Sequence, residues 1–376
     1  MVTGIGVISP LGRNREEFLT GLREGYDGSG PVTRFEHDSF PVRRVCEVKN
    51  FHLEFSPDPY IQFGLKAAEE AILDSGVKIE ELDPYRFGLV ASSSKGGMTS
   101  LERGEIQDFS PDRLNYYLAK KFRASGPMKC VVAACATGTY SIIEGARWIE
   151  QGDADFVLAG ASDASITPLM LAGYFQMGVY SKNGMCPYDA RRSGFLIGEG
   201  AGMVALESKA HAKARGARIY GEIAGYAFST DSFRATAFNP DSDALSRLLK
   251  DVLRKSDFAV SELDYFNTHG TSTWDGDRYE TDQIKKAFGK AAYGISYSST
   301  KSMVGHMLGA SGAVELIACL LAMQEGFIPP TIHLEQPDPA CDLDYTPHQS
   351  RQKKVDSACS ISMGFGGHLG ALLIQK

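Results

Sequence analysis

The chain has 376 residues, of which 43% are hydrophobic and 23% are charged. Because a single hydrophobic core stops growing at roughly 250–300 residues, we expect two domains or one large domain with two parts. The chain carries 39 Lys and Arg residues against 46 Asp and Glu residues, which gives a net charge of −7. A nucleic-acid-binding surface needs a clustered basic excess, so this balance argues against a general nucleic-acid binder.

The seven cysteines have irregular spacings and no CxxC pair, so they do not predict a disulfide framework. Reduced thiols are typical of a cytoplasmic protein, which we expect here. The apolar start MVTGIGVISPLG lacks a basic segment and contains Gly and Pro, which indicates a strand and a turn rather than a signal peptide. No apolar run approaches 18 residues, so we expect no membrane insertion.

Strand-like and helix-like patterns alternate along the chain, which favours an α/β layered fold. In the first half, the spacing of apolar residues predicts helices at Phe63–Ser75 and Thr139–Gln151 and strands at Arg86–Ser92, Cys130–Ala134, Asp155–Ala159 and Gly200–Glu207. In the second half, it predicts strands at Gly221–Ala227, Tyr265–Thr268, Ile295–Ser298, Ser357–Met363 and Leu369–Ile374 and helices at Asp243–Lys255, Arg278–Phe288 and Ser311–Gln324. A charged helix at Ser208–Gly216 separates the two series, so we predict halves at 1–209 and 210–376.

Cys135 lies in the segment VVAACATGTYSI, between a predicted buried strand and a predicted helix. At a helix N-terminus, free backbone N–H groups and the helix dipole stabilise a thiolate, so we expect a lowered pKa for this thiol. The small neighbours Ala134, Ala136 and Gly138 leave room for an acyl group. A single cysteine is more often a small buried hydrophobe, so the position favours a nucleophile without establishing one.

Two of the eight histidines lie in polar, Gly-rich loops that follow predicted strands. His269 lies in FNTHGTSTWDG, and His306 lies in TKSMVGHMLGASG, five residues after Lys301. Neighbouring glycines let the backbone and a substrate approach closely. Taken singly, each is more often a structural histidine with satisfied hydrogen bonds.

The segment Gly364–Gly367 (GFGG) is a second Gly-rich element and directly follows a predicted strand. It lacks the GxGxxG spacing and no helix is predicted after it, so a dinucleotide site is disfavoured. Two uses remain open. The turn can direct backbone N–H groups into a site as half of an oxyanion hole, or it can simply connect two strands.

Together these motifs resemble those of the β-ketoacyl-acyl carrier protein synthases, in particular the elongating enzymes of type II fatty acid synthesis and the similar polyketide ketosynthases. The resemblance covers nearly the whole chain and rests on seven segments in order: VTGIGVISPLG, ACATGTYSI, CPYDARRSGFLIGEGAGMVALE, THGTST, TKSMVGHMLGASGAVE, PPTIHLEQPDPACDLDY and GFGG. It implies a thiolase-like α/β fold, in which two similar halves form five αβαβα layers, usually in a homodimer.

The resemblance also implies roles for the candidate residues. Cys135 would take the acyl chain from a carrier protein, with the backbone N–H groups of Cys135 and Phe365 as the oxyanion hole. His269 and His306, as neutral donors, would hold the malonyl thioester oxygen and stabilise the enolate that forms when CO2 leaves. The carbanion would then attack the Cys135 thioester and release a 3-oxoacyl product.

Further residues would support this chemistry. The resemblance implies that Lys301 orients the pocket and that Glu315 supports it, although a purely structural role for both is the alternative. Phe365 would also act as a gate between flexible glycines. The residues expected to contact substrate are Thr271, Thr273, Gly364 and Gly366. No metal or organic cofactor is expected, because phosphopantetheine arrives on the acyl carrier protein and decarboxylation itself generates the nucleophile.

The chain departs from the family pattern in several places. The segment Asp108–Met128 is shorter than usual, and Trp274 stands where Pro is common. The predicted helix Phe63–Ser75 carries one lysine, Lys66, where several basic residues are usual. The other basic candidates for an acidic carrier protein are Lys213, Arg215, Arg218, Arg43 and Arg44, unless they form an ordinary solvated face. These departures suggest a specialised pathway.

The main expectation is a 3-oxoacyl-acyl carrier protein synthase that acts on acyl and malonyl thioesters. One alternative is the catalytic ketosynthase of a polyketide or polyene system, in a heterodimer with a partner subunit. Another is a catalytically silent scaffold, in which Cys135 would resist alkylation. A non-decarboxylating thiolase is disfavoured, because such enzymes use a second cysteine where this chain offers His269 and His306.

Overall fold

The computed structural model describes residues 1–36 and 40–376. The first sheet runs in the order β1 (Val2–Ile8), β6 (Gly200–Glu207), β5 (Phe156–Asp163) and β4 (Phe87–Ser92). Strands β4 and β5 are parallel, and β6 is antiparallel to both of its neighbours. All four strands are buried along their whole length, because helices cover both faces of the sheet. This explains why they are apolar runs without alternation.

The second sheet runs in the order β7 (Glu222–Thr230), β13 (His368–Gln375), β12 (Ser357–Gly364), β8 (Tyr265–Asn267) and β9 (Ser296–Ser298). Strands β12, β8 and β9 are parallel, whereas β13 is antiparallel to both β12 and β7. Two short pairs lie outside these sheets: β2 (Gly30–Pro31) with β3 (Arg44–Val45), and β10 (Phe327–Ile328) with β11 (Arg351–Gln352).

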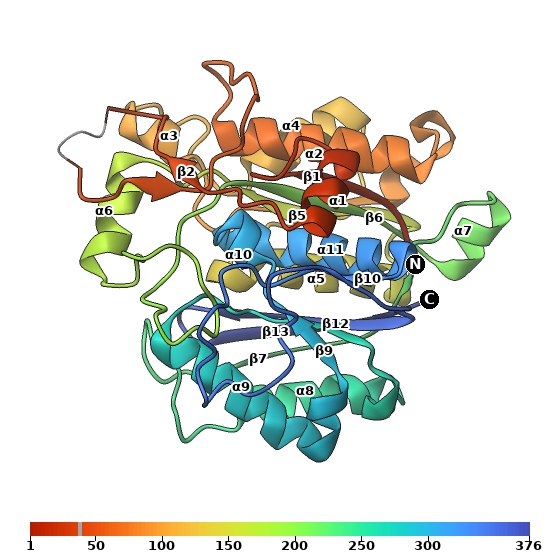
Figure 1. Ribbon diagram of the computed structural model, residues 1–376. Helices are drawn as coiled ribbons and strands as arrows, with labels where there is room; N and C mark the ends of the chain where they lie inside the picture. The colour runs from red at the N-terminus through yellow and green to blue at the C-terminus, as the bar shows by residue number, and fades with distance from the viewer. Residues whose placement is uncertain (37–39) are drawn as a thin grey trace.

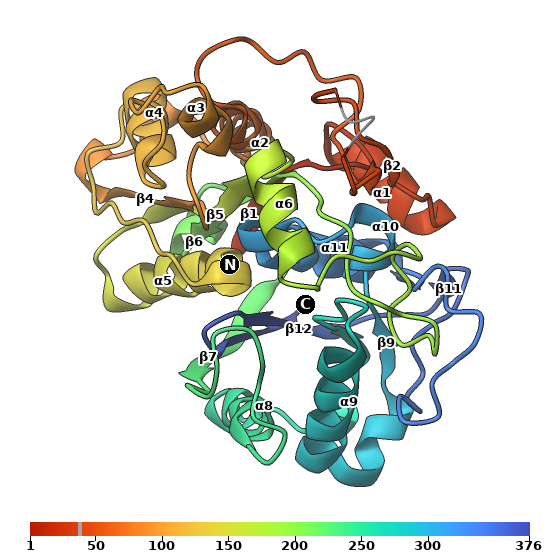
Figure 2. The same ribbon diagram turned by 90° about the vertical axis from the view of Figure 1, so that its left-hand side faces the viewer.

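Helices form three layers around the two sheets (Figures 1 and 2). The outer face of the first sheet carries α2 (Pro59–Ser75) and α4 (Arg113–Phe122). Between the sheets lie α5 (Thr137–Gln151) and α11 (Ser311–Glu325). The outer face of the second sheet carries α8 (Ala244–Lys255) and α9 (Trp274–Phe288). The five-layer thiolase-like fold implied by the resemblance is therefore confirmed.

Shorter helices connect these layers. They are α1 (Arg15–Glu24), α3 (Met98–Glu102), α6 (Pro168–Gln176), α7 (Lys209–Ala214) and α10 (Lys301–Val304). Helix α2 illustrates how local sequence sets the boundaries: Asp58 caps its first turn, Pro59 is its first residue, and Gly76 ends it in the left-handed conformation. The predicted end of this helix at Ser75 is confirmed.

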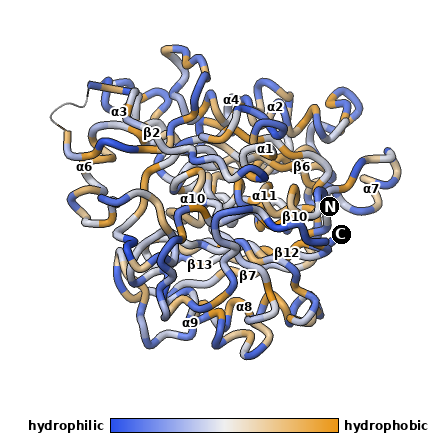
Figure 3. The backbone as a smooth tube through the Cα atoms, viewed as in Figure 1, coloured by the Kyte–Doolittle hydropathy of each residue, from blue (hydrophilic) through white to orange (hydrophobic). Residues whose placement is uncertain are grey.

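The middle layer is the most apolar part of the fold. Within the described residues, one helical stretch, Leu308–Glu325, is long and apolar enough to cross a membrane, but 89% of it is buried inside the protein. A helix that is apolar all round belongs in a core, here between two sheets. Figure 3 shows hydrophilic segments on the outer loops, while hydrophobic stretches concentrate in the inner layers.

The two middle helices touch each other closely near their N-termini. A Cβ atom added at Gly138 of α5 would lie 2.7 Å from the backbone nitrogen of Ala313 in α11. A Cβ atom at Gly312 would overlap the hydroxyl of Thr139. Real Cβ atoms do not approach other heavy atoms so closely, so glycine at both positions permits this contact.

The strand predicted at Cys130–Ala134 is wrong. Residues 126–129 pair only briefly with β4, through hydrogen bonds such as Leu89 N–H to Pro127 O at 2.9 Å. The chain then leaves the sheet and Val132 is 55% exposed. Helix α9 also begins four residues before the predicted start, at Trp274. The strands of the first sheet lie within residues 2–207 and those of the second within 222–375, while the predicted division at 209/210 stays a prediction.

Candidate active site

A cavity of about 770 Å³ lies where loops from the two sheets meet. It is lined by residues from distant parts of the chain, among them Cys135, His269, Thr271, Thr273, His306 and Phe365. The structure therefore brings together in one pocket the predicted nucleophile, both predicted histidines and the two predicted substrate-binding threonines.

Cys135 lies in a short 3-10 helix, Ala134–Ala136, that runs directly into α5. Its predecessor Ala134 has a φ of 47°, in the left-handed region that residues other than glycine seldom adopt. Such local strain is found at functional sites, where it fixes the direction of one side chain. Cys135 is 7% exposed and faces the cavity. The predicted placement of the sulfur at a helix N-terminus is confirmed.

His306 is the immediate neighbour of the thiol. Its Nε2 atom lies 3.0 Å from Cys135 Sγ, and its Nδ1 atom lies 3.1 Å from the hydroxyl of Ser311. The backbone holds the ring in place, because His306 N–H donates to Leu196 O and His306 O accepts from Gly198 N–H. The ring of Phe195 packs edge-on against the imidazole at 5.0 Å between centroids. His306 is therefore fixed on both sides.

His269 completes the pair of imidazoles. Its ring centroid lies 5.5 Å from that of His306, with the rings nearly perpendicular. The carboxylate of Glu280 anchors its loop by accepting the backbone N–H of His269 at 2.6 Å and that of Gly270 at 2.8 Å. Tyr188 donates its hydroxyl to the same carboxylate at 3.0 Å. The Nδ1 atom of His269 is buried without a hydrogen-bond partner among the described residues.

Burial and nearby cations keep both imidazoles neutral. Burial, followed by the electrostatic effects of Lys301 and of the neighbouring His306, lowers the pKa of His269 well below its usual range. Burial, followed by Lys301 and Lys95, does the same to His306. Neutral imidazoles can present one N–H donor and one acceptor each, which a charged pair could not do.

The pKa expected for Cys135 is wrong in direction. Burial raises the pKa of this thiol above its ordinary value, although Lys95, Lys301 and the backbone N–H of Phe365 act in the opposite sense. The cause is the enclosed position of the sulfur, because a low dielectric disfavours the thiolate. The helix N-terminus therefore does not by itself produce a thiolate, and a proton acceptor close to the sulfur becomes important.

The GFGG turn lies against the nucleophile. The backbone N–H of Phe365 is directed at Cys135. A Cβ atom added at Gly364 would lie 3.2 Å from the backbone nitrogen of Cys135 and 2.7 Å from Ala133 O. The backbone N–H groups of Cys135 and Phe365 therefore lie beside the same small space, as an oxyanion hole requires. Gly366 is different: it is exposed, and its N–H donates to Ala235 O.

Lys301 and Glu315 lie behind the pocket and do not line it. Both are almost completely buried, at 0% and 2% exposure, and they form an ion pair with each other. Lys301 begins α10 and Glu315 lies in α11, so the pair ties the loop that carries His306 to the central helix. The structure thus places them as supports for the pocket.

Three polar groups near the site were not predicted from the sequence. Glu280 anchors the His269 loop, as described above. Asp163, at the end of β5, accepts hydrogen bonds from Ser94 and from Gly309 N–H at 2.6 Å each. Lys95, the residue after Ser94, acts to lower the pKa of both Cys135 and His306. The sequence signal was present, since SSSKGG is another Gly-rich loop directly after a buried strand.

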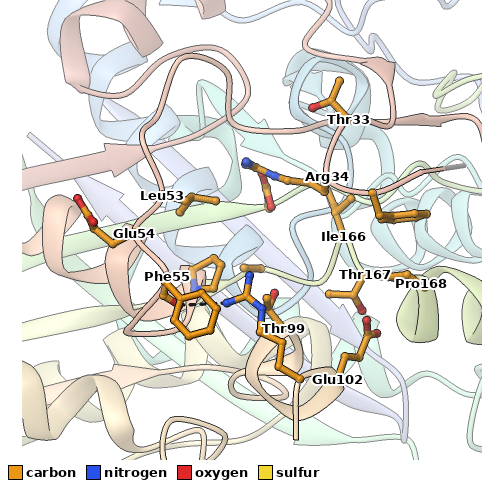
Figure 4. Close-up of a pocket in the computed structure, with 15 residues that line it drawn as sticks. Thr33, Arg34, Leu53, Glu54, Phe55, Thr99, Glu102, Ile166, Thr167 and Pro168 are labelled. Atoms are coloured by element: carbon orange, nitrogen blue, oxygen red, sulfur yellow. Dashed lines mark hydrogen bonds and ion pairs between the residues drawn. The ribbon is translucent and has the colours of Figure 1, made fainter. Parts of the chain in front are cut away.

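Among the described residues, neither a thiol nor an imidazole lines a second cavity, of about 720 Å³ (Figure 4). Its charged groups are engaged within the protein: Arg34 pairs with Glu199, and Arg103 packs over the ring of Phe55 at 4.6 Å. Its wall includes Ile166, which also belongs to the apolar cluster around Cys135. This cavity is therefore separated from the nucleophile by that cluster.

Family models match almost the whole of this architecture. The N-terminal domain model of β-ketoacyl synthase matches residues 1–212, and the C-terminal domain model of β-ketoacyl synthase matches residues 220–335. The chain belongs to the β-ketoacyl synthase family. Within this family, the first match contains Cys135 and the second contains both His269 and His306, whereas Phe365 lies beyond the matched residues.

Other β-ketoacyl synthases share the full length of the chain. The 3-oxoacyl-[acyl-carrier-protein] synthase 2 of Synechocystis is 39% identical, over 100% of this chain and 97% of that protein. Among solved structures, a type II polyketide ketosynthase in complex with its acyl-carrier protein and bound to the hexaketide has a TM-score of 0.92, with 32% identity over 100% and 98% of the two chains. The ishigamide ketosynthase/chain length factor has a TM-score of 0.91, with 32% identity and the same coverage.

Proposed function

We propose that this β-ketoacyl synthase catalyses the decarboxylating condensation of an acyl group on Cys135 with malonyl-acyl carrier protein, to give 3-oxoacyl-acyl carrier protein. The observation that carries the proposal is the grouping of one thiol and two neutral imidazoles in one pocket, with His306 Nε2 3.0 Å from Cys135 Sγ. Relatives named as 3-oxoacyl-acyl carrier protein synthases over the full length support the same reaction class.

In the first half-reaction, Cys135 Sγ attacks the thioester carbonyl of the acyl donor. The new S–C bond forms, the old C–S bond breaks, and the oxyanion is held by the backbone N–H groups of Cys135 and Phe365. His306 Nε2 takes up the thiol proton and passes it to the departing carrier thiolate. This role matters because burial raises the pKa of Cys135.

In the second half-reaction, the malonyl thioester oxygen accepts hydrogen bonds from His269 and His306. The C–C bond to the carboxylate breaks, CO2 leaves, and the electron pair is held as an enolate. The enolate carbon attacks the Cys135 thioester, so that a C–C bond forms, the C–S bond breaks and the released Cys135 thiolate takes up a proton from water. The Ser311 hydroxyl can donate to or accept from His306 Nδ1, so it supports both tautomers that these steps need.

The reaction needs no metal or organic cofactor in this proposal, because loss of CO2 generates the carbon nucleophile. Phosphopantetheine would enter on the carrier protein, and Thr271 and Thr273, whose hydroxyl oxygens lie 3.0 Å apart on the pocket wall, would bind its amides. The acidic carrier protein would dock at the pocket mouth beside Arg234.

The basic residues of α7 and the segment after it are less suitable for this docking. Helix α7 lies at the opposite end of the molecule from α6, whose C-terminal end lies near the pocket (Figure 1). Arg215 there is paired with Glu207, and Arg218 is paired with Asp74. Their position and pairing favour the pocket mouth over Arg215 and Arg218 as the carrier-binding surface.

We expect the protein to act in the cytoplasm as a dimer. Apolar side chains gather where the chain leaves the first sheet and along α6: Met128 is 46% exposed, Val132 55% and Leu169 55%. Exposed apolar residues of this size favour contact with another protein surface. A second copy of this chain would give a homodimer. A partner subunit without the cysteine would give the alternative, a polyketide-type heterodimer, which the likeness to a ketosynthase/chain length factor supports.

The decisive experiment is reconstitution with purified carrier proteins. The wild-type chain, incubated with acyl- and malonyl-acyl carrier protein, should form 3-oxoacyl carrier protein and release one CO2 per product, as measured by mass spectrometry and CO2 trapping. Cys135→Ala should form no product while keeping the native fold. A folded wild type that neither acylates Cys135 nor releases CO2 would favour the silent scaffold instead.

A further inference from the structure

Lys95 is a partly buried cation near the active site. It follows β4 in the loop SSSKGG, and its ammonium donates to Ser94 Oγ at 2.9 Å. Ser94 Oγ in turn donates to Asp163 at 2.6 Å. The ammonium also lies 5.8 Å from the centroid of the Tyr174 ring. None of these side chains lines the entrance pocket.

A chain of packed rings connects Lys95 to the nucleophile. Tyr174 packs edge-on against Phe195 at 5.8 Å, Phe195 packs against His306 at 5.0 Å, and His306 contacts Cys135. Tyr174, Phe195 and Cys135 belong to one apolar cluster, whose other members include Leu171 and Leu308. Lys95, linked to Asp163 through Ser94, is therefore a charged group at the edge of the apolar cluster that contains Cys135.

The ammonium is retained in its charged form. Burial opposes the charge, but the acidic groups of Tyr174, Asp163 and Cys135 raise the pKa of Lys95 above its ordinary value. An ammonium has three donors, and among the described residues Ser94 and Tyr174 accept from it. One donor therefore remains to be directed at a substrate.

A saturated acyl chain would suit this position poorly. Covering a charged ammonium with hydrocarbon removes its solvation without providing a new acceptor, which is costly. Asp163 cannot compensate further, because it already accepts from Ser93, Ser94 and Gly309. An oxygen atom on the acyl chain would instead accept the remaining N–H of Lys95.

The space beyond the apolar cluster is lined by both polar and apolar side chains. The cavity of about 720 Å³ shares Ile166 with that cluster. Its other walls carry Thr33, Arg34, Thr99 and Thr167, which Figure 4 shows around a common space. A hydrocarbon tail that moved past Ile166 would meet hydroxyl groups and the Arg34 guanidinium as well as apolar side chains such as Leu53.

We propose, building on the proposed function, that Lys95 is a specificity-determining residue that favours acyl groups whose chain carries a hydrogen-bond-accepting oxygen. The oxygen can belong to a 3-oxo, a 3-hydroxy or a distal carboxylate group, since each would accept from the ammonium. The preferred acyl donor is thus an oxygenated chain rather than a saturated fatty acyl chain.

The test compares the rates at which Cys135 is acylated by N-acetylcysteamine thioesters of equal chain length: hexanoyl, 3-hydroxyhexanoyl, 3-oxohexanoyl and adipoyl. Intact-protein mass spectrometry reports each acyl-enzyme. For the wild type we expect at least one oxygenated chain to load about tenfold faster than hexanoyl, a ratio equivalent to about 1.4 kcal/mol. Lys95→Met keeps a side chain of similar length without the charge. In this variant, the ratio of oxygenated to hexanoyl acylation rates should fall to near the ratio that the same thioesters show in their uncatalysed reaction with a free thiol. The thioester whose rate relative to hexanoyl falls most in Lys95→Met identifies the position of the oxygen that Lys95 binds.

Two controls keep the result interpretable. Lys120→Met, on the exposed surface of α4, should leave every ratio unchanged. Should Lys95→Met fail to fold, Tyr174→Phe removes only the hydroxyl beside the ammonium and should also change the ratio. Equal ratios in the wild type and in the folded variant would overturn this inference alone. No acylation of Cys135 by any thioester would overturn the proposed function and, with it, this inference.

Discussion

His306 Nε2 lies 3.0 Å from Cys135 Sγ, although the two residues are 171 positions apart in the sequence. The cysteine precedes α5, which packs under the first sheet, and the histidine belongs to the loop before α11. Their contact therefore depends on how the two middle helices are packed. It also means that one imidazole must serve both thiol activation and enolate stabilisation.

The reactivity of Cys135 should depend on pH in a specific way. Because burial raises its pKa, the thiolate fraction should still be increasing at the ordinary thiol value of about 8.5. Alkylation by iodoacetamide should therefore accelerate about tenfold from pH 7 to pH 8 and continue to rise above pH 8.5. Mass spectrometry of the modified peptide gives the rate, with the half-buried Cys130 as an internal comparison. A plateau below pH 8 would show that the pKa is instead lowered.

The two histidines should differ in their effects on the two half-reactions. His269→Ala removes one donor to the enolate, so CO2 release from malonyl carrier protein should fall by about 10²–10³-fold, while acylation of Cys135 stays near the wild-type rate. His306→Asn should slow both steps, because His306 also contacts the sulfur. Separate measurements of acyl-enzyme formation and CO2 release distinguish the two. Equal effects on both steps in both variants would contradict this division.

Gly364 should be intolerant of a methyl group. In Gly364→Ala, the new Cβ would lie 3.2 Å from the Cys135 nitrogen and 2.7 Å from Ala133 O, so it would disturb the space where the oxyanion develops. We expect acylation to fall by about 10²-fold or more. Gly173→Ala in α6 is the matched control, because a Cβ there meets nothing within 4 Å. Similar acylation rates for both variants would exclude an oxyanion hole at this turn.

Breaking the buried ion pair of Lys301 and Glu315 should lower the free energy of unfolding. Glu315→Leu would leave the Lys301 charge buried without its partner, which should lower the free energy of unfolding by about 3–5 kcal/mol. The double variant Lys301→Met/Glu315→Leu should recover most of this loss, since both charges are gone. Urea denaturation monitored by circular dichroism measures both. If the double variant were as unstable as the single one, the charges would not be the cause.

Glu280 should make stability depend on pH. Burial raises its pKa to about 7, above the ordinary value of 4.5, although the N–H groups of Gly270 and His269 act against this shift. Between these two values the folded protein binds a proton that the unfolded chain has lost, so the free energy of unfolding should fall as pH rises from about 4.5 to 7.

Glu280→Gln tests whether Glu280 causes this pH dependence of stability, because the amide cannot titrate. The stability difference between wild type and variant should therefore shrink as the pH is raised across this window. Thermal melts at pH 5, 6, 7 and 8 give the comparison. A constant difference at all four values would show that Glu280 does not change its protonation there.

The sequence predicted the layers of the fold well, because buried strands and amphipathic helices leave regular patterns. It failed at Cys130–Ala134, where an apolar run suggested a strand. Val131 and Val132 are β-formers by type, but the segment turns away from β4 to bring Cys135 to the helix N-terminus, and this tertiary constraint outweighs local preference.

For the site, the sequence identified residues that stand out in Gly-rich loops, and the structure brings Cys135, His269 and His306 together. The sequence could not reveal the protonation behaviour of Cys135, because desolvation depends on how the whole pocket closes. Lys95 and Glu280 were missed for a related reason. Their importance comes from neighbours that are distant in sequence, such as Tyr174 for Lys95 and the His269 loop for Glu280.

The glycine contact between α5 and α11 limits how this enzyme can change. Because Gly138 and Gly312 bring the helices to contact, the halves cannot slide or separate without moving the sulfur away from its imidazole. New preferences for the acyl chain would thus have to arise from substitutions of side chains around the fixed Cys135–His306 pair. Replacing one half with that of a distant homologue should lower the turnover rate while the protein still folds. Transferring the contact residues of α5 and α11 together with that half should prevent this loss.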